Sequence, residues 1–95
     1  MIVFSWNSAN IAHIAKHAVE PADAEYVVRN GGKGFPRKLG DGKLIVKGRT
    51  RQGRWIQVIY ICPADDEIDP DSLSLVDLIT YSAGQAKVVY VIHAM

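Results

Sequence analysis

The sequence predicts a single α+β domain over residues 1–95, with an N-terminal strand and two helices packed on an antiparallel sheet. Three observations predict this fold. The chain has 95 residues, which suffices for one modest core. Its composition is 48% hydrophobic and 22% charged, which excludes disordered and fibrous proteins. The elements follow one another as a strand, two helices and then a series of strands.

The first predicted elements are a strand over Ile2 to Trp6 and a helix extending to about His17. Asn7 or Ser8 caps this helix, because its side-chain oxygen can accept hydrogen bonds from the free amides of the first turn. The apolar residues of the helix recur at helical spacing. They are Ile11, Ile14, Ala15 and Ala18.

A second helix is predicted to begin at Pro21, because proline suits the first helical position. Asp23 and Glu25 favour the positive end of its dipole. Gly31 and Gly32 end it, since helices commonly terminate on a residue with positive φ.

The next predicted elements are a mobile basic loop and a β-hairpin. Residues Gly31 to Gly42 contain five glycines and predict the loop. Lys43 to Thr50 and Arg54 to Cys62 are the clearest strands, joined by a two-residue turn at Gln52 and Gly53.

The last third of the chain begins with an acidic loop over Pro63 to Pro70. Leu73 to Ser82 combines apolar spacing that suits a helix with β-branched residues that suit a strand, and we favour a strand. Val88 to His93 is predicted to be a strand as well.

Opposite charges are segregated along the chain. Residues 29–54 carry nine lysines and arginines against one acid, a net charge of +8. Residues 65–77 carry six acids and no base, a net charge of −6. The formal net charge of +1 therefore conceals a strongly basic segment, and such asymmetry favours a polyanionic partner.

Other sequence features bear on cellular location. The longest apolar runs, Val58 to Cys62 and Val88 to Ile92, fall far short of the roughly 18 residues of a membrane span. Residues Ile2 to Trp6 lack the basic and long apolar regions of a signal peptide. Cys62 is the single cysteine, so no internal disulfide can form. We expect a cytoplasmic protein with no membrane partner.

The predicted hairpin arranges basic side chains on one sheet face. A two-residue turn places Arg51 opposite Arg54, and alternation then divides the two strands between two faces. The predicted basic face consists of Lys43, Lys47, Arg49, Arg54 and Tyr60. The predicted core face consists of Leu44, Val46, Trp55, Ile59 and Ile61. Guanidinium groups bind phosphate and an aromatic ring can stack on a base, although a solvated strand face explains the same pattern.

The three histidines suggest several roles. His13 and His17 have the spacing of a metal-binding pair, but neither the usual glutamate nor a third ligand accompanies them, so we expect no metal. A histidine at a helix end can instead interact with the last carbonyls. His93 shares a predicted strand face with Val89 and Val91, where a histidine usually has a structural role. The alternating acids of residues 65–71 lack the glycine and closing glutamate of a calcium loop.

Short motifs spread along nearly the whole chain are informative when taken together. Those of the N-terminal part are Phe4-Ser5-Trp6-Asn7, Asn10, Lys16-His17-Ala18-Val19 and Ala24. Those of the C-terminal part are Gly48-Arg49-Thr50, Gly53-Arg54 before the strand Ile56 to Ile61, and Tyr90-Val91-Ile92-His93-Ala94. They resemble the BrnT family of type II toxin–antitoxin ribonucleases, which have a RelE-like fold. Residues 63–87 have no counterpart in that family, and its basic C-terminal helix has none here.

The resemblance implies a single BrnT-like domain that cleaves RNA and thereby inhibits translation, without a metal or other cofactor. It implies that Arg49 and Arg54 stabilise charge on the scissile phosphate, and that His17 or His93 is the general acid or base. The remaining expected RNA-binding residues are Lys16, Lys43, Lys47 and Tyr60. A DNA-binding antitoxin of BrnA type is the implied partner.

Two other functions are compatible with the sequence. The protein is then either a non-catalytic RNA-binding or regulatory module with the same fold, or an interaction subunit whose acidic loop docks a basic partner. An exposed sheet edge would also allow a homodimer.

Overall fold

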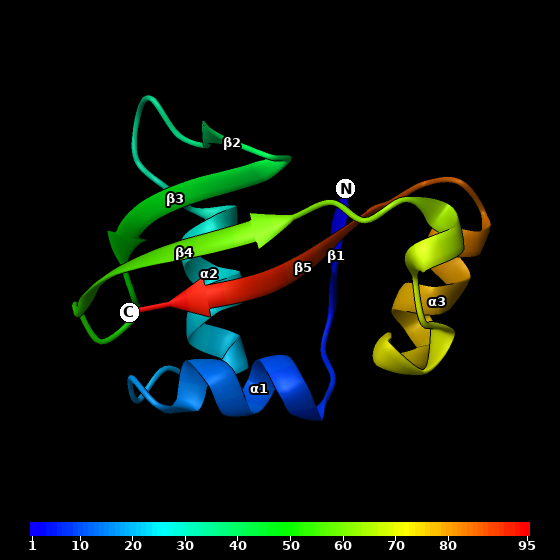
Figure 1. The fold of residues 1–95 in the computed structure, drawn as a ribbon, viewed down its shortest axis with the longest axis horizontal. Helices are drawn as coiled ribbons and strands as arrows, with labels where there is room; N and C mark the ends of the chain where they lie inside the picture. The colour runs from blue at the N-terminus through cyan, green and yellow to red at the C-terminus, as the bar shows by residue number, and fades with distance from the viewer.

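The computed structural model describes residues 1–95 and confirms the α+β class (Figure 1). The main elements are β1 (Ile2–Ser5), α1 (Ser8–Ala15), α2 (Pro21–Arg29), β2 (Arg37–Gly40), β3 (Lys43–Arg49), β4 (Trp55–Ile61), α3 (Leu75–Ser82) and β5 (Lys87–Ala94). Two short 3₁₀ turns, Asp65–Glu67 and Pro70–Ser72, precede α3. None of the helices is long and apolar enough to span a membrane.

The strands form one five-stranded sheet in the order β1-β5-β4-β3-β2. The antiparallel β3–β4 hairpin was predicted, and β2 and β5 also pair with antiparallel neighbours in it. Strand β1 pairs with β5 in parallel, so the sheet is mixed and not purely antiparallel as expected. The parallel pair brings the first and last strands of the chain side by side. The residues between β1 and β5 form the long connection that a parallel pair needs.

The predicted helix starts are confirmed at both N-terminal helices. The Asn7 side chain accepts a hydrogen bond from the Asn10 amide at 3.0 Å, and Asn10 Oδ1 accepts one from the Asn7 amide at 2.8 Å. Helix α1 ends at Ala15 rather than His17, because the chain turns sharply through Ala18, whose φ is 57°. Helix α2 begins at Pro21 as predicted.

Two predicted elements were wrong. The segment Gly31 to Gly42 is not entirely a loop, since β2 forms within it and pairs with β3 at the sheet edge. The segment Leu73 to Ser82 contains helix α3 instead of a strand. Ser74 caps this helix by accepting a hydrogen bond from the Asp77 amide at 3.1 Å, a local signal that outweighs the β-branched content.

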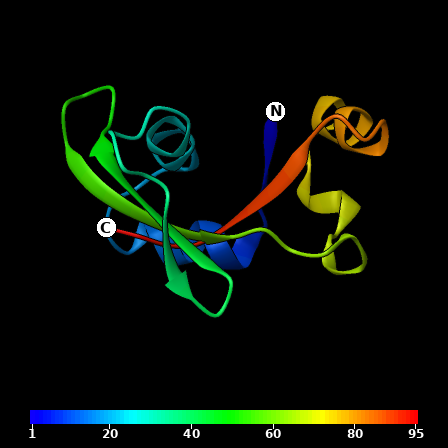
Figure 2. The ribbon, with the colours of Figure 1, turned by 90° about the horizontal axis from the view of Figure 1, so that it is seen from above.

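One main core joins the two N-terminal helices to the sheet. Ile14 of α1, and Ala24 and Val27 of α2, are at most 1% exposed and belong to the same cluster as the inward-facing residues of β3, β4 and β5. Figure 2 shows α2 on one side of the twisted sheet. No helix packs on the opposite side of β3 and β4. On that outer face, Lys43, Arg49 and Trp55 are exposed, whereas Ile45 in the middle is buried.

Helix α1 also protects an edge of the sheet. Strand β1 pairs with β5 only as far as Tyr90, and α1 follows the remaining half of β5 (Figure 1). The buried Asn10 side chain donates hydrogen bonds to the Ser5 carbonyl at 3.0 Å and to the Val91 carbonyl at 3.2 Å. The Asn10 amide therefore fastens α1 to both strands at this edge.

Candidate functional site

The register of the β3–β4 hairpin differs by one residue from the prediction. Arg49 lies opposite Trp55, and Lys47 lies opposite Gln57. The turn has three residues, with the Thr50 amide bonded to the Arg54 carbonyl at 2.8 Å and Gly53 at a φ of 86°. Three-residue hairpin loops commonly end on such a residue, whereas two-residue loops need positive φ at positions that Gln52 does not suit.

This register changes which aromatic side chain lies on the basic face. Tyr60 was predicted there but lies in the core and is 6% exposed. Burial raises the pKa of its hydroxyl group, and the nearby Cys62 raises it further. Trp55 was predicted in the core but is 57% exposed on the outer face. A one-residue slip moves every side chain of a strand to the other face, so these two errors have one cause.

The outer face of the hairpin retains three of the predicted basic residues. Lys43, Lys47 and Arg49 lie on this face of β3 and share it with Trp55. The buried Ile45 lies between Lys43 and Lys47 on the same face. Arg49 donates a hydrogen bond from Nη1 to the Gly53 carbonyl at 3.0 Å, and its guanidinium carbon lies 5.7 Å from the centre of the Trp55 ring. The side chain is thus held beside the indole at the hairpin end.

A β-bulge determines the direction of His93. Tyr60 pairs with Val91, whereas the preceding residue, Ile59, pairs with His93, so Ile92 is an extra residue on β5. Simple alternation predicts that His93 and Val91 share a face. Because of the extra residue, they lie on opposite faces. Bulges often re-aim a side chain in this way.

All three histidines of the chain meet at the bulge. His13 Nε2 lies 3.2 Å from His93 Nδ1, and the ring centres of His13 and His17 each lie 5.4 Å from that of His93. His13 and His17 are one turn apart on α1 and at its end, and both are exposed. The sequence separates the two from His93 by at least 76 positions, so their helical spacing alone does not reveal the cluster.

The cluster shifts the ionisation of one of its members. Burial lowers the pKa of His93 below the usual value of 6.5, and the neighbouring His13 and His17 lower it further. His93 is therefore neutral at pH values where an ordinary histidine is partly protonated, a state in which an imidazole can accept a proton.

Arg54 occupies a different position from the one predicted. Its guanidinium donates hydrogen bonds to the His17 carbonyl at 2.6 Å and the Ala18 carbonyl at 2.8 Å. These bonds bind free carbonyls at the end of α1, a favourable place for a cation. Arg54 is therefore a positioning residue for the segment that carries His17. Lys16, which was predicted to bind RNA, lies next to His17 and is exposed.

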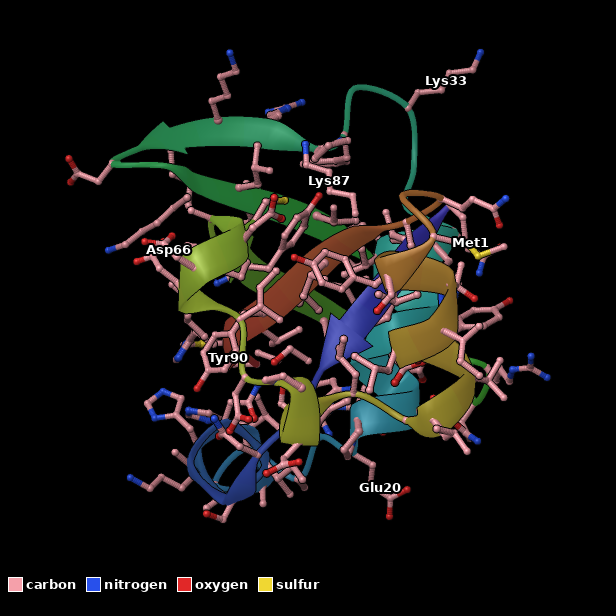
Figure 3. All side chains as sticks on the ribbon, turned by 90° about the vertical axis from the view of Figure 1, so that its right-hand side faces the viewer. Met1, Glu20, Lys33, Asp66, Lys87 and Tyr90 are labelled. Carbon is pink, nitrogen blue, oxygen red and sulfur yellow. The ribbon has the colours of Figure 1, made fainter.

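The acidic and basic segments are separated in space. The acidic turns and α3 lie at one end of the long axis, and the β3–β4 turn lies at the other (Figure 1). Lys33 extends away from the body of the protein on the loop before β2 (Figure 3). The acidic segment therefore does not cover the hairpin end that carries Arg49 and Trp55.

No three histidine, cysteine or acidic side chains are grouped so that they could hold a metal ion. Comparison of the chain with family models, with curated proteins and with solved structures gave no match. The structure adds His13 and Trp55 to the residues predicted from the sequence, and removes Tyr60 from the surface.

Proposed function

We propose that the protein is an RNA endonuclease of the cytoplasm that works without a metal ion. The observation that carries the proposal is the convergence of His13, His17 and His93 on the sheet face whose far end carries Lys47 and Arg49. Ribose carries a 2′-hydroxyl next to each phosphate, so a base and an acid placed about one phosphate apart can drive cleavage.

His93 is the proposed general base. In the tautomer in which His93 Nδ1 donates its hydrogen to His13 Nε2, the other ring nitrogen of His93 has a free lone pair. The lowered pKa keeps this ring neutral near pH 7. His13 then orients the base, as a third group orients the histidine in a nucleophile–base pair.

The proposed reaction transfers the phosphoryl group within the RNA. His93 takes the proton of the 2′-hydroxyl, whose oxygen forms a bond to the adjacent phosphorus. The bond from phosphorus to the 5′-oxygen breaks, and protonated His17 gives that oxygen its proton. The products are a 2′,3′-cyclic phosphate and a 5′-hydroxyl, with no oxidant or cofactor consumed. Lys16, next to His17, provides positive charge for the cleaved phosphate, and Arg49 binds a phosphate farther along the strand.

The experiment is cleavage of an unstructured RNA in EDTA by the protein and its His93→Ala, His17→Ala and His13→Ala variants. We expect His93→Ala and His17→Ala to lower the rate about 100-fold or more, and His13→Ala to lower it less. Lys33→Ala is the control, since this residue lies on a loop away from the cluster. Cleavage that survives both His93→Ala and His17→Ala contradicts the assignment.

A binding module with the same fold is the second candidate, and the exposed basic face by itself favours it. Salt-sensitive RNA binding without cleavage by the unmodified protein supports this alternative. Arg54→Ala does not discriminate between the two functions, because it also releases the His17 segment.

The biological role that we propose is that of a type II toxin that inhibits translation and is neutralised by an antitoxin of BrnA type. Expression of the protein in bacteria is expected to stop growth, and expression of His93→Ala is not. Equal growth of both strains at equal protein levels contradicts the toxin role.

A further inference from the structure

We infer that Trp55 and Arg49 form a stacking subsite for an unpaired base of single-stranded RNA, about four nucleotides from the bond cut at the histidine cluster. The inference rests on the proposed function for its distance from the cleaved bond. The stacking itself is tested without cleavage.

The exposure of Trp55 is the first observation. Its side chain is 57% exposed, although tryptophan is usually largely buried. Trp6, the other tryptophan, has the ordinary structural role, because its Nε1 donates a hydrogen bond to Glu25 at 2.8 Å and its ring stacks on Phe4. The Trp55 indole has no such hydrogen bond or aromatic partner, and the Arg49 guanidinium is the cation that lies over its ring. The exposed part of the indole is therefore available to a ligand.

Arg49 supplies the second observation. Its guanidinium is held beside the indole by one hydrogen bond to the Gly53 carbonyl, and it faces Trp55 across the strand pair. A base stacked on the indole thus has a cation next to it for the adjoining phosphate. Lys47 follows on the same face and extends the positive charge toward the histidines.

The distance to the histidine cluster follows from the strands. Trp55 and Ile59 are four residues apart on β4, which at about 3.3 Å per residue is about 13 Å. His93 lies opposite Ile59 on the neighbouring strand. A stacked strand advances about 3.4 Å per nucleotide, so the gap corresponds to about four nucleotides.

The chemistry of the subsite selects single strands. In a duplex, the bases are stacked on one another and paired, so an aromatic ring on a flat protein surface cannot reach their faces. An unpaired base can stack on an indole whatever its identity. We therefore expect little preference for base sequence at this position.

The test uses a Trp6→Phe background, in which Trp55 is the only tryptophan and reports its own contacts by fluorescence. The probe is a non-cleavable 2′-O-methyl RNA, either single-stranded or annealed to its complement. We expect the single strand to quench the fluorescence. The variants Trp55→Ala and Trp55→Phe lack tryptophan in this background, so their affinity is measured by the anisotropy of an end-labelled RNA. We expect Trp55→Ala to bind about 10-fold more weakly and Trp55→Phe to keep part of the affinity. Leu39→Ala is the matched control, because Leu39 is an apolar side chain of β2 that is 51% exposed.

The outcomes separate this inference from the proposed function. Absence of quenching, or equal binding of the duplex, overturns the stacking subsite whether or not the protein cleaves RNA. Quenching by a protein that does not cleave RNA leaves the subsite in place and contradicts the proposed function. If both hold, Trp55→Ala should lower kcat/KM for long substrates but not for those with fewer than about four nucleotides on the relevant side. An equal effect on short substrates overturns the proposed distance.

Discussion

Replacement of Asn10 by alanine is expected to detach helix α1 from the sheet and to separate the histidines. The Asn10 side chain is 3% exposed and forms three hydrogen bonds. Two of them are donated to the carbonyls of Ser5 and Val91, and the third is accepted from the Asn7 amide. No other side chain joins α1 to both strands in this way.

The magnitude follows from these bonds. Each contributes about 0.5–1.5 kcal/mol net, and the carbonyls of two buried residues lose a partner, so the expected loss is about 2–4 kcal/mol. A chain of 95 residues has a free energy of unfolding of roughly 5–14 kcal/mol, so the loss is a large fraction of it.

The assay is urea unfolding followed by circular dichroism, with Asn10→Asp as the paired variant. The carboxylate cannot donate to either carbonyl, so Asn10→Asp should destabilise the protein more than Asn10→Ala at neutral pH. Burial near carbonyl oxygens raises the pKa of such a carboxyl group, and its protonated form can donate one bond. The difference in unfolding free energy between Asn10→Asp and the unmodified protein should therefore narrow at low pH.

The same variants test whether the attachment of α1 to the sheet edge maintains the histidine cluster. A detached α1 moves His13 away from His93, so the lowered pKa of His93 should return toward its usual value, as measured by NMR titration. A loss in Asn10→Ala of less than about 0.5 kcal/mol, within the range of ordinary surface substitutions, would refute this reasoning.

Three further predictions concern the core and the site. The pKa of His93 is near 6.5 in the unfolded state and lower in the folded state, so the unfolded state binds more protons between these two values. The free energy of unfolding should therefore fall as the pH decreases through this range. In His93→Asn, the free energy of unfolding measured in urea should depend less on pH there. Arg54→Ala should lower the free energy of unfolding by about 1 kcal/mol, and Arg54→Lys should restore only part of this loss, because an ammonium lacks the planar pair of donors that binds the two carbonyls. Thermal unfolding measures both variants, and full recovery in Arg54→Lys contradicts the geometry. Ile14→Ala should cost about 2–5 kcal/mol in chemical unfolding, whereas Ile11→Ala, at a side chain that is 40% exposed, should cost less than about 1 kcal/mol; similar losses would contradict the assigned core face of α1.

Local sequence signals predicted the two N-terminal helices closely. Asn7 and Pro21 mark their starts through interactions within one turn, and these depend on few distant residues. The Ser74 cap of α3 is an equally local signal, but the strand prediction for this segment relied on its β-branched residues and did not use the cap. The strand β2 had no such signal, because only pairing with β3 makes its glycine-rich segment extended.

The basic segment and its approximate place on a hairpin were therefore determined by the sequence alone. The tertiary structure decided which side chains share a face: one residue of register exchanged Tyr60 for Trp55, and one extra residue in β5 turned His93 toward α1. Strand alternation has a period of two, so a single-residue shift reverses a face without changing the composition of the strand. The meeting of three histidines from opposite ends of the chain likewise depends on the packing of α1 along β5, which no local pattern encodes.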